Sequence, residues 1–397
     1  GAPRIEEKMG INEQNWGMVV SAFGLGYALF EIPGGFLGDW LGPKKVLIRI
    51  VLWWSGFTAL MGWMWNGMSL AICQFLFAAG EAGGFPNLTK AFASWLRKEE
   101  RVKIQGIMWA AARTGGAFTP LIVLAVFDGI ESFGIPKSAS WRWAFGCFGI
   151  FGLVWVTLFW RWFKDKPRDH KGVNAAELEL LKEVEGMGGG HGDVPWGKLV
   201  RSRTVWLLWV QYFCLTFPWY FYITYLSKYL QQFRHLSEKS AAYFAVFPLL
   251  FGALGCLCSG MIAATLARKM GVVKSRRLLA CVGFGGAATF ILIATQLESP
   301  YLAIAAFAIA SFSNDLTMPG SWGTCMDIGG KYAGTVAGSM NMMGNLAGFA
   351  SPFVCGIILQ RTGGDYNQFI YVGAAVYLVG LVSWPFIDPV TPIEAGA

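Results

Sequence analysis

The chain of 397 residues is too apolar and too weakly charged for an ordinary water-soluble enzyme. Hydrophobic residues make up 55% of it and charged residues only 14%, whereas soluble domains carry about 25% charged residues. The formal net charge is +8, but the basic residues sit in loops on one side of the expected membrane, which argues against a nucleic-acid partner. We therefore expect a protein embedded in a lipid bilayer.

Apolar runs long enough to cross a bilayer recur along the chain. A hydrocarbon core about 30 Å thick needs roughly 20 apolar residues in a helix. We therefore predict an all-helical protein with about eleven spans, at 16–41, 46–66, 68–95, 104–127, 142–163, 204–230, 241–266, 278–296, 301–322, 334–357 and 369–387. Connectors after alternate spans are rich in Lys and Arg, and the positive-inside rule places them in the cytoplasm. Residue 1 is then outside and the C-terminus inside.

The longest connector divides the chain into near-equal halves. We predict four segments: an N-terminal bundle at 1–163, a cytoplasmic linker at 164–203, a C-terminal six-helix bundle at 204–387 and a short cytoplasmic tail at 388–397. Within the linker, VNAAELELLKEVEG is a candidate amphipathic helix, and the following GMGGGHGD has the composition of a flexible tether. Two such halves are typical of transporters built from repeats that rock about a midplane site.

A glycine-rich stretch with an acidic residue and a basic pair follows the first span. GGFLGDWLGPKK at 34–45 resembles the signature loop between helices two and three of the major facilitator superfamily. The residues that fit this signature are Gly35, Asp39, Gly42, Lys44 and Lys45. Trp40 stands in place of the usual arginine, and the second copy, GMIAATLARKMG from Gly260, has Ala264 in place of the aspartate. Two weakened copies half a chain apart indicate an internal repeat.

Further stretches together resemble the anion:cation symporter branch of that superfamily, which includes sugar-acid and sialin-like transporters. They are YALFEIPGG at 27–35, GEAGGFP at 80–86, WLRKEER at 95–101, WRW at 141–143, DKPRDHKGVNAAE at 165–177, WYFYITYLSKYL at 219–230 and DIGGKYAGTVAGSMNMMGNLAG from Asp327. The resemblance covers essentially the whole chain and implies the major facilitator fold of two pseudo-symmetric bundles. It also implies that the family's first helix, which bears an Asp-Arg pair used in anion and proton handling, is missing from this sequence.

Three carboxyl groups lie inside apolar spans, where burying an ion is costly. Glu81 lies in mid-span, and the resemblance implies that the glutamate of GEAGGFP acts in proton coupling; the alternative is a neutral residue hydrogen-bonded to a neighbouring helix. Glu31 has the same two interpretations. Asp315, beside Asn314, interrupts an apolar run shortly before Pro319 and is the third candidate proton-coupling group.

Arg113 is the main candidate for substrate binding. It lies about nine residues inside its span and needs an anionic partner, and a guanidinium fork matches a carboxylate through two parallel hydrogen bonds. Arg113 therefore either binds the anionic substrate or pairs with Glu31, Glu81 or Asp315.

Uncharged polar residues complete the candidate substrate contacts. Tyr27 stands where sugar-acid members contact substrate through a tyrosine, unless it only packs as an aromatic ring. Gln211 and Tyr212 lie deep in their span, whereas Trp219 and the tyrosines after it fit an interfacial aromatic belt. Asn341 and Asn345 share one helix face. That amide pair suits polyol hydroxyls, and its alternative role is to hold helices together.

These features predict a secondary active transporter that carries a small organic anion by proton symport and alternating access. A hydroxylated sugar acid, a hexonate or hexuronate, is the favoured substrate. The alternatives are a carrier of inorganic phosphate or of an amino-acid or monocarboxylate anion, a gradient-independent exchanger, and a transporter-like membrane sensor. The sequence has no nucleophile, metal or cofactor motif, so we expect no enzyme activity, metal or cofactor. We expect a monomer in the cell membrane, specifically a bacterial inner membrane.

Overall fold

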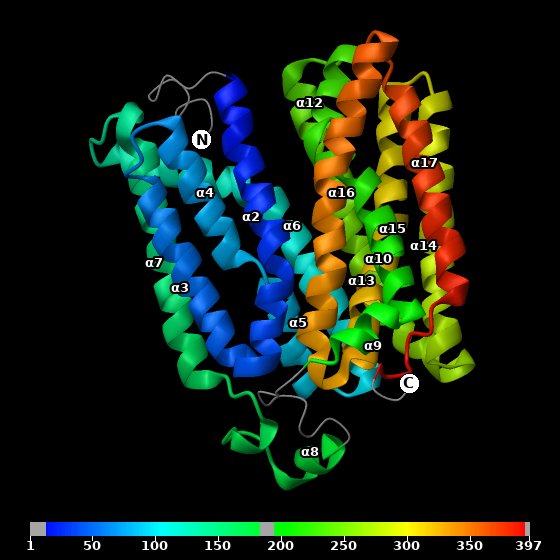
Figure 1. The fold of residues 1–397 in the computed structure, drawn as a ribbon. Coiled ribbons are helices and arrows are strands. Elements are labelled where there is room, and N and C mark those ends of the chain that lie inside the picture. Colours follow the sequence, from blue (N-terminus) through cyan, green and yellow to red (C-terminus); the bar gives the residue numbers. More distant parts are fainter. Residues whose placement is uncertain (1–12, 183–193, 394–397) are drawn as a thin grey trace. The chain divides into compact units, whose positions relative to one another are not determined.

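The computed structural model describes residues 13–182 and 194–393, and every regular element in these ranges is a helix (Figure 1). The first half contains α2 (Glu13–Leu41), α3 (Pro43–Met61), α4 (Gly67–Glu81), α5 (Gly84–Trp95), α6 (Lys98–Ser132), α7 (Lys137–Trp162) and α8 (Ala175–Leu180). The second contains α9 (Trp196–Arg201), α10 (Arg203–Thr224), α11 (Leu226–Lys228), α12 (Glu238–Phe244), α13 (Val246–Met270), α14 (Val272–Gln296), α15 (Pro300–Gly329), α16 (Ala333–Thr362) and α17 (Tyr366–Ser383). Each of the eleven predicted spans coincides with one of these helices or with successive ones, so the all-helical prediction is confirmed.

The chain separates into two compact units. The first unit holds the described residues of 1–95, 118–194 and 331–342, and the second holds those of 96–117, 195–330 and 343–397. Helices α6 and α16 each contribute residues to both units. This grouping follows proximity and not continuous chain segments, so the predicted bundle boundaries stay a prediction.

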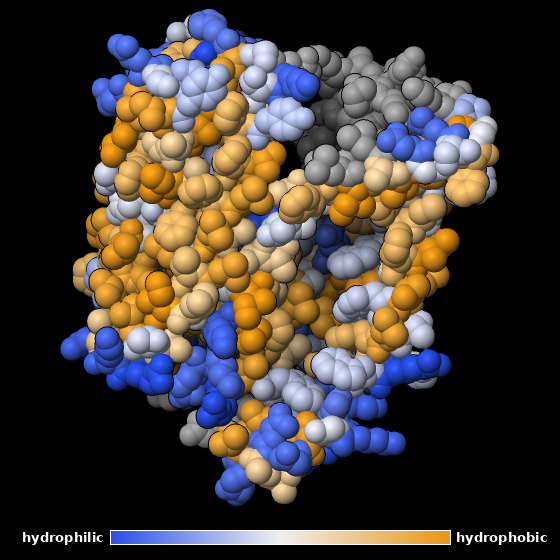
Figure 2. Space-filling model, turned by 180° about the vertical axis from the view of Figure 1, so that it is seen from behind, coloured by the Kyte–Doolittle hydropathy of each residue, from blue (hydrophilic) through white to orange (hydrophobic). Residues whose placement is uncertain are grey.

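The helices have the composition of membrane spans. Six described stretches are long and apolar enough to cross a bilayer, namely Gly67–Trp95, Ala139–Trp162, Lys239–Met270, Val272–Gln296, Pro300–Thr362 and Tyr366–Phe386. Large apolar side chains such as Trp63, Trp162 and Phe349 are exposed, and Figure 2 shows hydrophobic side chains over much of the outer face, with hydrophilic ones gathered toward its ends. An outer face of this kind is stable against lipid tails and not against water.

Each unit has its own apolar interior. In the first, α2 packs against α4 and α3 against α7, around a core that includes Met61, Leu70, Phe127 and Trp141. In the second, α15 packs against α13 and α14, and α17 packs against α10 and α14. The aromatic rings that contact one another there are Phe221, Tyr229, Phe307, Tyr366 and Phe369.

The two signature loops share one backbone geometry, which supports the predicted internal repeat. Gly42 precedes α3 with φ 88° and ψ 143°, and Gly271 precedes α14 with φ 83° and ψ 157°. A positive φ of this size is strained for any residue with a Cβ atom. Glycine therefore makes the same sharp helix-to-helix turn in both halves.

Three predicted elements differ from the structure. The span 68–95 is broken between α4 and α5. The span 204–230 is interrupted at Tyr225, between α10 and α11, and continues into a π-helical turn, Tyr229–Phe233. In the linker, α8 covers only Ala175–Leu180, where the Asn174 side chain caps it by accepting a hydrogen bond from the Glu177 amide at 2.9 Å. The predicted tether GMGGGHGD and the segment before Glu13 lie outside the described residues.

Gly34 and Gly24 of α2 offer a matched test of this packing. A Cβ atom on Gly34 would lie 2.5 Å from the Ala82 carbonyl oxygen and 2.8 Å from the Gly83 Cα, whereas nothing lies within 4 Å of one on Gly24. We expect Gly34→Ala to lower the free energy of unfolding by about 1–3 kcal/mol through overpacking. Gly24→Ala should be neutral or stabilising by up to about 1 kcal/mol. Thermal unfolding of both variants in detergent checks this, and equal effects would contradict the close approach.

Candidate functional site

The GEAGGFP segment forms a polar break in a membrane-spanning stretch. Helix α4 ends at Glu81, Ala82 leaves the helical conformation with ψ 138°, and Gly83 has φ +87°. The Gly83 amide therefore has no helical acceptor, and it donates a hydrogen bond to Glu31 Oε2 at 2.8 Å. The Asn87 side chain donates to the Gly83 carbonyl oxygen at 2.8 Å. The break thus leaves the Gly83 amide free of the helix, so that it can donate its hydrogen bond to Glu31 of α2.

Glu31 is fully buried and doubly hydrogen-bonded in the first unit. Besides the Gly83 amide on Oε2, its Oε1 accepts a hydrogen bond from Asn341 Nδ2 of α16. Glu81 is only partly buried, lies close enough to Glu31 for the two carboxylates to repel each other, and forms no ion pair within the described part of the chain. The structural hydrogen bonding predicted as one role of Glu31 is therefore present, and proton coupling stays a prediction for both groups.

Tyr27 lies on the same helix, one turn before Glu31. Its ring is 9% exposed and packs with Ala78 and Ala82, and its centroid is 5.6 Å from that of Phe23. The packing role considered for Tyr27 is thus observed, and its role as a substrate contact stays untested.

Asp39, at the end of α2, is the centre of a buried polar cluster. Its Oδ1 accepts a hydrogen bond from the Gly334 amide at 3.1 Å, and its Oδ2 accepts from the Thr335 amide at 2.6 Å and hydroxyl at 2.7 Å. Lys90 Nζ lies 3.3 Å from Oδ1, and both side chains are almost fully buried. Asp39 therefore caps the N-terminus of α16, where a helix favours negative charge, and neutralises Lys90.

The other signature residues take separate places around this cluster. Gly35 allows the close approach of α16, since a Cβ atom there would lie 2.2 Å from the Gly334 carbonyl oxygen. The Lys44 amide donates to Asp165 Oδ1 at 2.8 Å, and Lys45 is exposed. Lys90 was not predicted from the sequence; the signal was a single lysine inside the apolar stretch NLTKAFASW.

Arg113 and Asp315 form a buried ion pair in the second unit. Arg113 Nε lies 2.9 Å from Asp315 Oδ2, and Arg113 Nη2 lies 3.1 Å from Oδ1. The Arg113 side chain is 10% exposed and that of Asp315 is 0% exposed. Asn314 Nδ2 also donates to Asp315 Oδ1 at 2.8 Å. Of the carboxyl groups considered as partners, Asp315 is the one that holds the guanidinium fork.

Trp219 covers one face of this guanidinium. The Arg113 Cζ atom lies 3.9 Å from the Trp219 ring centroid, a separation at which the ring attracts a cation. Trp219 therefore stacks on a cation that lies inside a predicted span, and its place in an interfacial belt stays a prediction.

Gln211 and Tyr212 of α10 bind neighbouring helices. Gln211 Oε1 accepts hydrogen bonds from Ser321 Oγ at 3.3 Å and Trp384 Nε1 at 3.2 Å, and the side chain is fully buried. Tyr212 Oη accepts from Trp322 Nε1 at 3.1 Å. These contacts fix α10 against α15, so the structure gives both residues a packing role. Of the two asparagines of α16, Asn341 donates to Glu31, and Asn345, one helical turn later, is half-buried.

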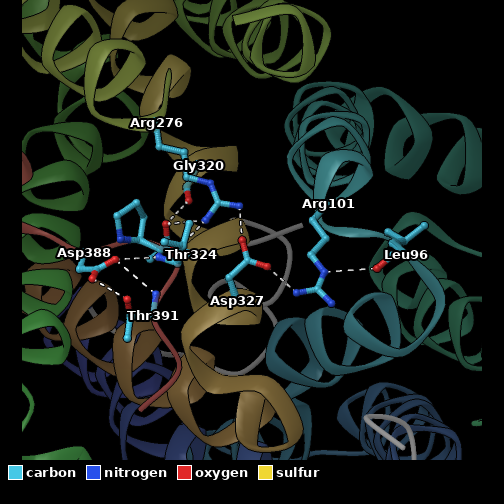
Figure 3. A network of polar contacts seen from close by, with 10 residues as sticks. Leu96, Arg101, Arg276, Gly320, Thr324, Asp327, Asp388 and Thr391 are labelled. Atoms are coloured by element: carbon cyan, nitrogen blue, oxygen red, sulfur yellow. Dashed lines mark hydrogen bonds and ion pairs between the residues drawn. The ribbon is translucent and has the colours of Figure 1, made fainter. Parts of the chain in front are cut away.

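A third charged cluster joins two arginines to one aspartate in the second unit (Figure 3). Arg101 and Arg276 each pair with a different oxygen of Asp327. Arg276 Nη1 also donates to the Pro389 carbonyl oxygen at 2.7 Å, and Arg101 Nε donates to the Leu96 carbonyl oxygen at 3.3 Å. Both arginines lie in connectors that we predicted from the sequence to be loops between spans. In the structure Arg101 is 0% exposed and Arg276 is 3% exposed. The shared carboxylate and the backbone oxygens offset the cost of burying the two guanidinium groups.

Comparison with known proteins gives consistent matches along the chain. Residues 2–352 match the family model described as "Major Facilitator Superfamily". The probable sulfoacetate transporter of Cupriavidus necator is 34% identical over 99% of this chain and 90% of its own length, and the hexuronate transporter of Bacillus subtilis is 26% identical over 100% and 91%. A solved proton:xylose symporter superposes with a TM-score of 0.75 at 15% identity, over 99% of this chain and 92% of that one. The last match shows the fold alone.

Breaking the Asp39–Lys90 pair should be costly. Asp39→Asn leaves the Lys90 ammonium buried without a negative partner, and we expect the free energy of unfolding to fall by about 3–5 kcal/mol. Lys90→Met added to Asp39→Asn should recover much of this loss. Glu100→Gln is the matched control, because the Arg97–Glu100 pair at 3.2 Å is 42% exposed on each side and such pairs contribute up to about 1 kcal/mol. Comparable losses in thermal unfolding of Asp39→Asn and Glu100→Gln would contradict the role of burial.

Proposed function

Since the chain belongs to the Major Facilitator Superfamily, and is therefore a multi-pass membrane transporter and not an enzyme, we propose that its cargo is a small organic anion taken up together with a proton. Two of its relatives are named as transporters of organic anions, sulfoacetate and hexuronate. We also propose that the protein is a monomer in a bacterial inner membrane, and its basic connectors favour a cytoplasmic C-terminus.

The Arg113 guanidinium carries this proposal. It is a cation inside a membrane helix, it remains 10% exposed, and it already holds a carboxylate in the two-bond geometry. A guanidinium fork in apolar surroundings binds a carboxylate, sulfonate or phosphate group far better than an uncharged molecule. An anionic cargo is therefore the class of substrate that this group selects.

Among organic anions, a hydroxylated sugar acid is our first candidate. The hexuronate transporter of Bacillus subtilis matches the whole chain, and hydroxyl and amide groups from α10, α15 and α17 lie beside Arg113, as set out below. Sulfoacetate is also a candidate, and we rank it second. The relative of Cupriavidus necator that is named for it is more similar to this chain than the hexuronate transporter is. A sulfonate oxygen pair fits the same fork.

The energetic cost of moving a charge through the membrane favours the transport of an anion together with a proton. An anion that moves with one proton adds no net charge to the loaded carrier, so no unpaired charge crosses the apolar interior. Glu81 is our candidate coupling group in the first unit, because its carboxylate has no ion-pair partner among the described residues. Glu31, already hydrogen-bonded to Gly83 and Asn341, lies near enough to interact electrostatically with Glu81.

Uptake into proteoliposomes tests the proposal. The panel is labelled D-galactonate, D-gluconate, D-glucuronate, sulfoacetate and inorganic phosphate, each with and without an inward proton gradient. One-to-one symport of a monoanion is electroneutral, so a gradient of one pH unit should drive about tenfold accumulation. We expect Glu81→Gln to abolish this accumulation and to retain counterflow exchange. Glu179→Gln, in the exposed linker helix α8, should behave like the wild type.

Each outcome of the panel has a defined meaning. Accumulation of a sugar acid or of sulfoacetate supports organic-anion symport and decides between the two candidates. Accumulation of phosphate alone would contradict the organic class, and equilibration that ignores the gradient would contradict the proton coupling.

Arg113→Lys tests the anion anchor directly. Lysine keeps the positive charge but loses the fork, and a hydrogen bond to a charged group contributes about 1.5–3 kcal/mol. We expect the KM for the transported acid to rise about tenfold to a hundredfold, with the protein still folded. Arg361→Lys, at an exposed site of α16, is the control. An unchanged KM in Arg113→Lys would show that the anion binds elsewhere.

A further inference from the structure

The Arg113–Asp315 pair is surrounded by buried polar atoms that lack a hydrogen-bond partner among the described residues. They are Trp219 Nε1, Tyr222 Oη, Ser311 Oγ, Asn314 Oδ1 and Tyr377 Oη. Buried polar atoms in native proteins are nearly always paired with protein, water or ligand. Five such atoms in one region of the second unit therefore indicate a site that takes a polar molecule.

These atoms come from three helices. Trp219 and Tyr222 belong to α10, Ser311 and Asn314 to α15, and Tyr377 to α17. Trp219 stacks on the guanidinium, and Asn314 binds Asp315 through its amide nitrogen, which leaves its oxygen available. Ser311 Oγ and Asp315 Oδ2 both face Gly252 of α13, since a Cβ atom there would lie 3.0 Å and 2.5 Å from them. Because Gly252 has no side chain, the Asp315 carboxylate can lie close to the backbone of α13.

Tyrosines and a cysteine are the titratable groups around the ion pair. Tyr212 and Tyr220 of α10 interact electrostatically with Arg113 and, as tyrosines, are normally uncharged at neutral pH. Tyr222 of α10, Tyr377 of α17 and Cys256 of α13 all interact electrostatically with Asp315. Tyr222 and Tyr377 are 4% and 0% exposed. At neutral pH these two tyrosines and the cysteine are also normally uncharged, so the charge balance of the region is set by Arg113 and Asp315.

The balance of charge between Arg113 and Asp315 limits which molecules can bind beside the pair. Arg113 and Asp315 contribute one positive and one negative charge, so the pair is neutral. An added oxyanion would leave one uncompensated negative charge in an interior where isolated charges are strongly disfavoured. Neutrality returns only if a proton comes with the anion, and Asp315 is the carboxylate that the anion would compete with for Arg113.

Given the anion transport proposed above, the geometry points to the Arg113–Asp315 pair as an exchangeable anion site: the oxyanion of the substrate takes the place of Asp315 on Arg113, and the Asp315 carboxyl takes up one proton. The two N–H···O contacts to Asp315 are replaced by two to the substrate, and the proton is taken up from the buffered solution. The site is neutral before and after the exchange. The surrounding hydroxyl, amide and indole groups fit the hydroxyls of a small acid, which makes hydroxylated carboxylates or sulfonates the ligand class.

Calorimetry of the purified protein tests the exchange. Binding of D-galactonate, D-glucuronate and sulfoacetate is titrated in two buffers of different ionisation enthalpy, which gives the number of protons taken up per anion bound. The wild type should take up one proton more than Asp315→Asn. At neutral pH, Asp315→Asn should also bind the anion about tenfold more tightly, because no internal carboxylate occupies Arg113. Glu100→Gln removes an exposed carboxyl and should match the wild type.

A second variant protects the test against misfolding, because Asp315→Asn leaves Arg113 buried without its counter-charge. The double variant Arg113→Gln with Asp315→Asn carries no charge at either position and leaves no charge buried without a partner, and we expect it to fold and to bind none of the three acids. Wild-type binding by the double variant, or equal proton uptake by the wild type and Asp315→Asn, would overturn the exchange while leaving anion transport in place. Absence of binding of every acid to the folded wild type would instead overturn the proposed function, and the exchange with it.

Discussion

A charge buried away from water needs an opposite charge and hydrogen bonds around it, and this constraint organises the interior of both units. In the first unit it joins Asp39 to Lys90 and to the N-terminus of α16. In the second it joins Arg101 and Arg276 to Asp327, and Arg113 to Asp315. These contacts link segments far apart in the sequence, so the helices are positioned by charge pairs as well as by apolar packing.

The three clusters differ in how completely their carboxylates are bound. Asp39 receives two backbone amides, a hydroxyl and a lysine, and Asp327 receives two guanidinium groups. Asp315 receives one guanidinium and one amide, and polar atoms without partners lie beside it. The first two arrangements are suited to holding structure. The third is suited to exchange, which is the property that a reversible anion site requires.

The sequence predicted the helices well because length and apolar content determine membrane spans. It also singled out Glu31, Glu81, Arg113 and Asp315, since charges inside apolar runs are conspicuous. It could not predict that Asp315, out of three candidates, pairs with Arg113, because that depends on which helices pack together. The break at Gly83 was missed because GEAGGFP keeps the apolar run uninterrupted, and its double glycine and proline were the available signal.

Side chains in the predicted connectors were harder to place. Arg101 and Arg276 lie in basic segments that the positive-inside rule assigns to loops, yet both are buried. The rule counts charges near the ends of spans and carries no information on whether a carboxylate such as Asp327 lies within reach. Gln211 and Tyr212 are predicted to contact substrate from deep in their span, and the structure shows both side chains buried, with polar atoms bonded to Ser321, Trp384 and Trp322. Composition and depth alone do not separate a substrate contact from a contact between helices.

The most direct test of the central claim is a structure determined by cryo-electron microscopy with the transported acid bound. Our account predicts an oxyanion within hydrogen-bond distance of the Arg113 guanidinium, with the Asp315 carboxyl displaced from Nε and Nη2. An acid bound elsewhere, with the Arg113–Asp315 pair intact, would contradict it.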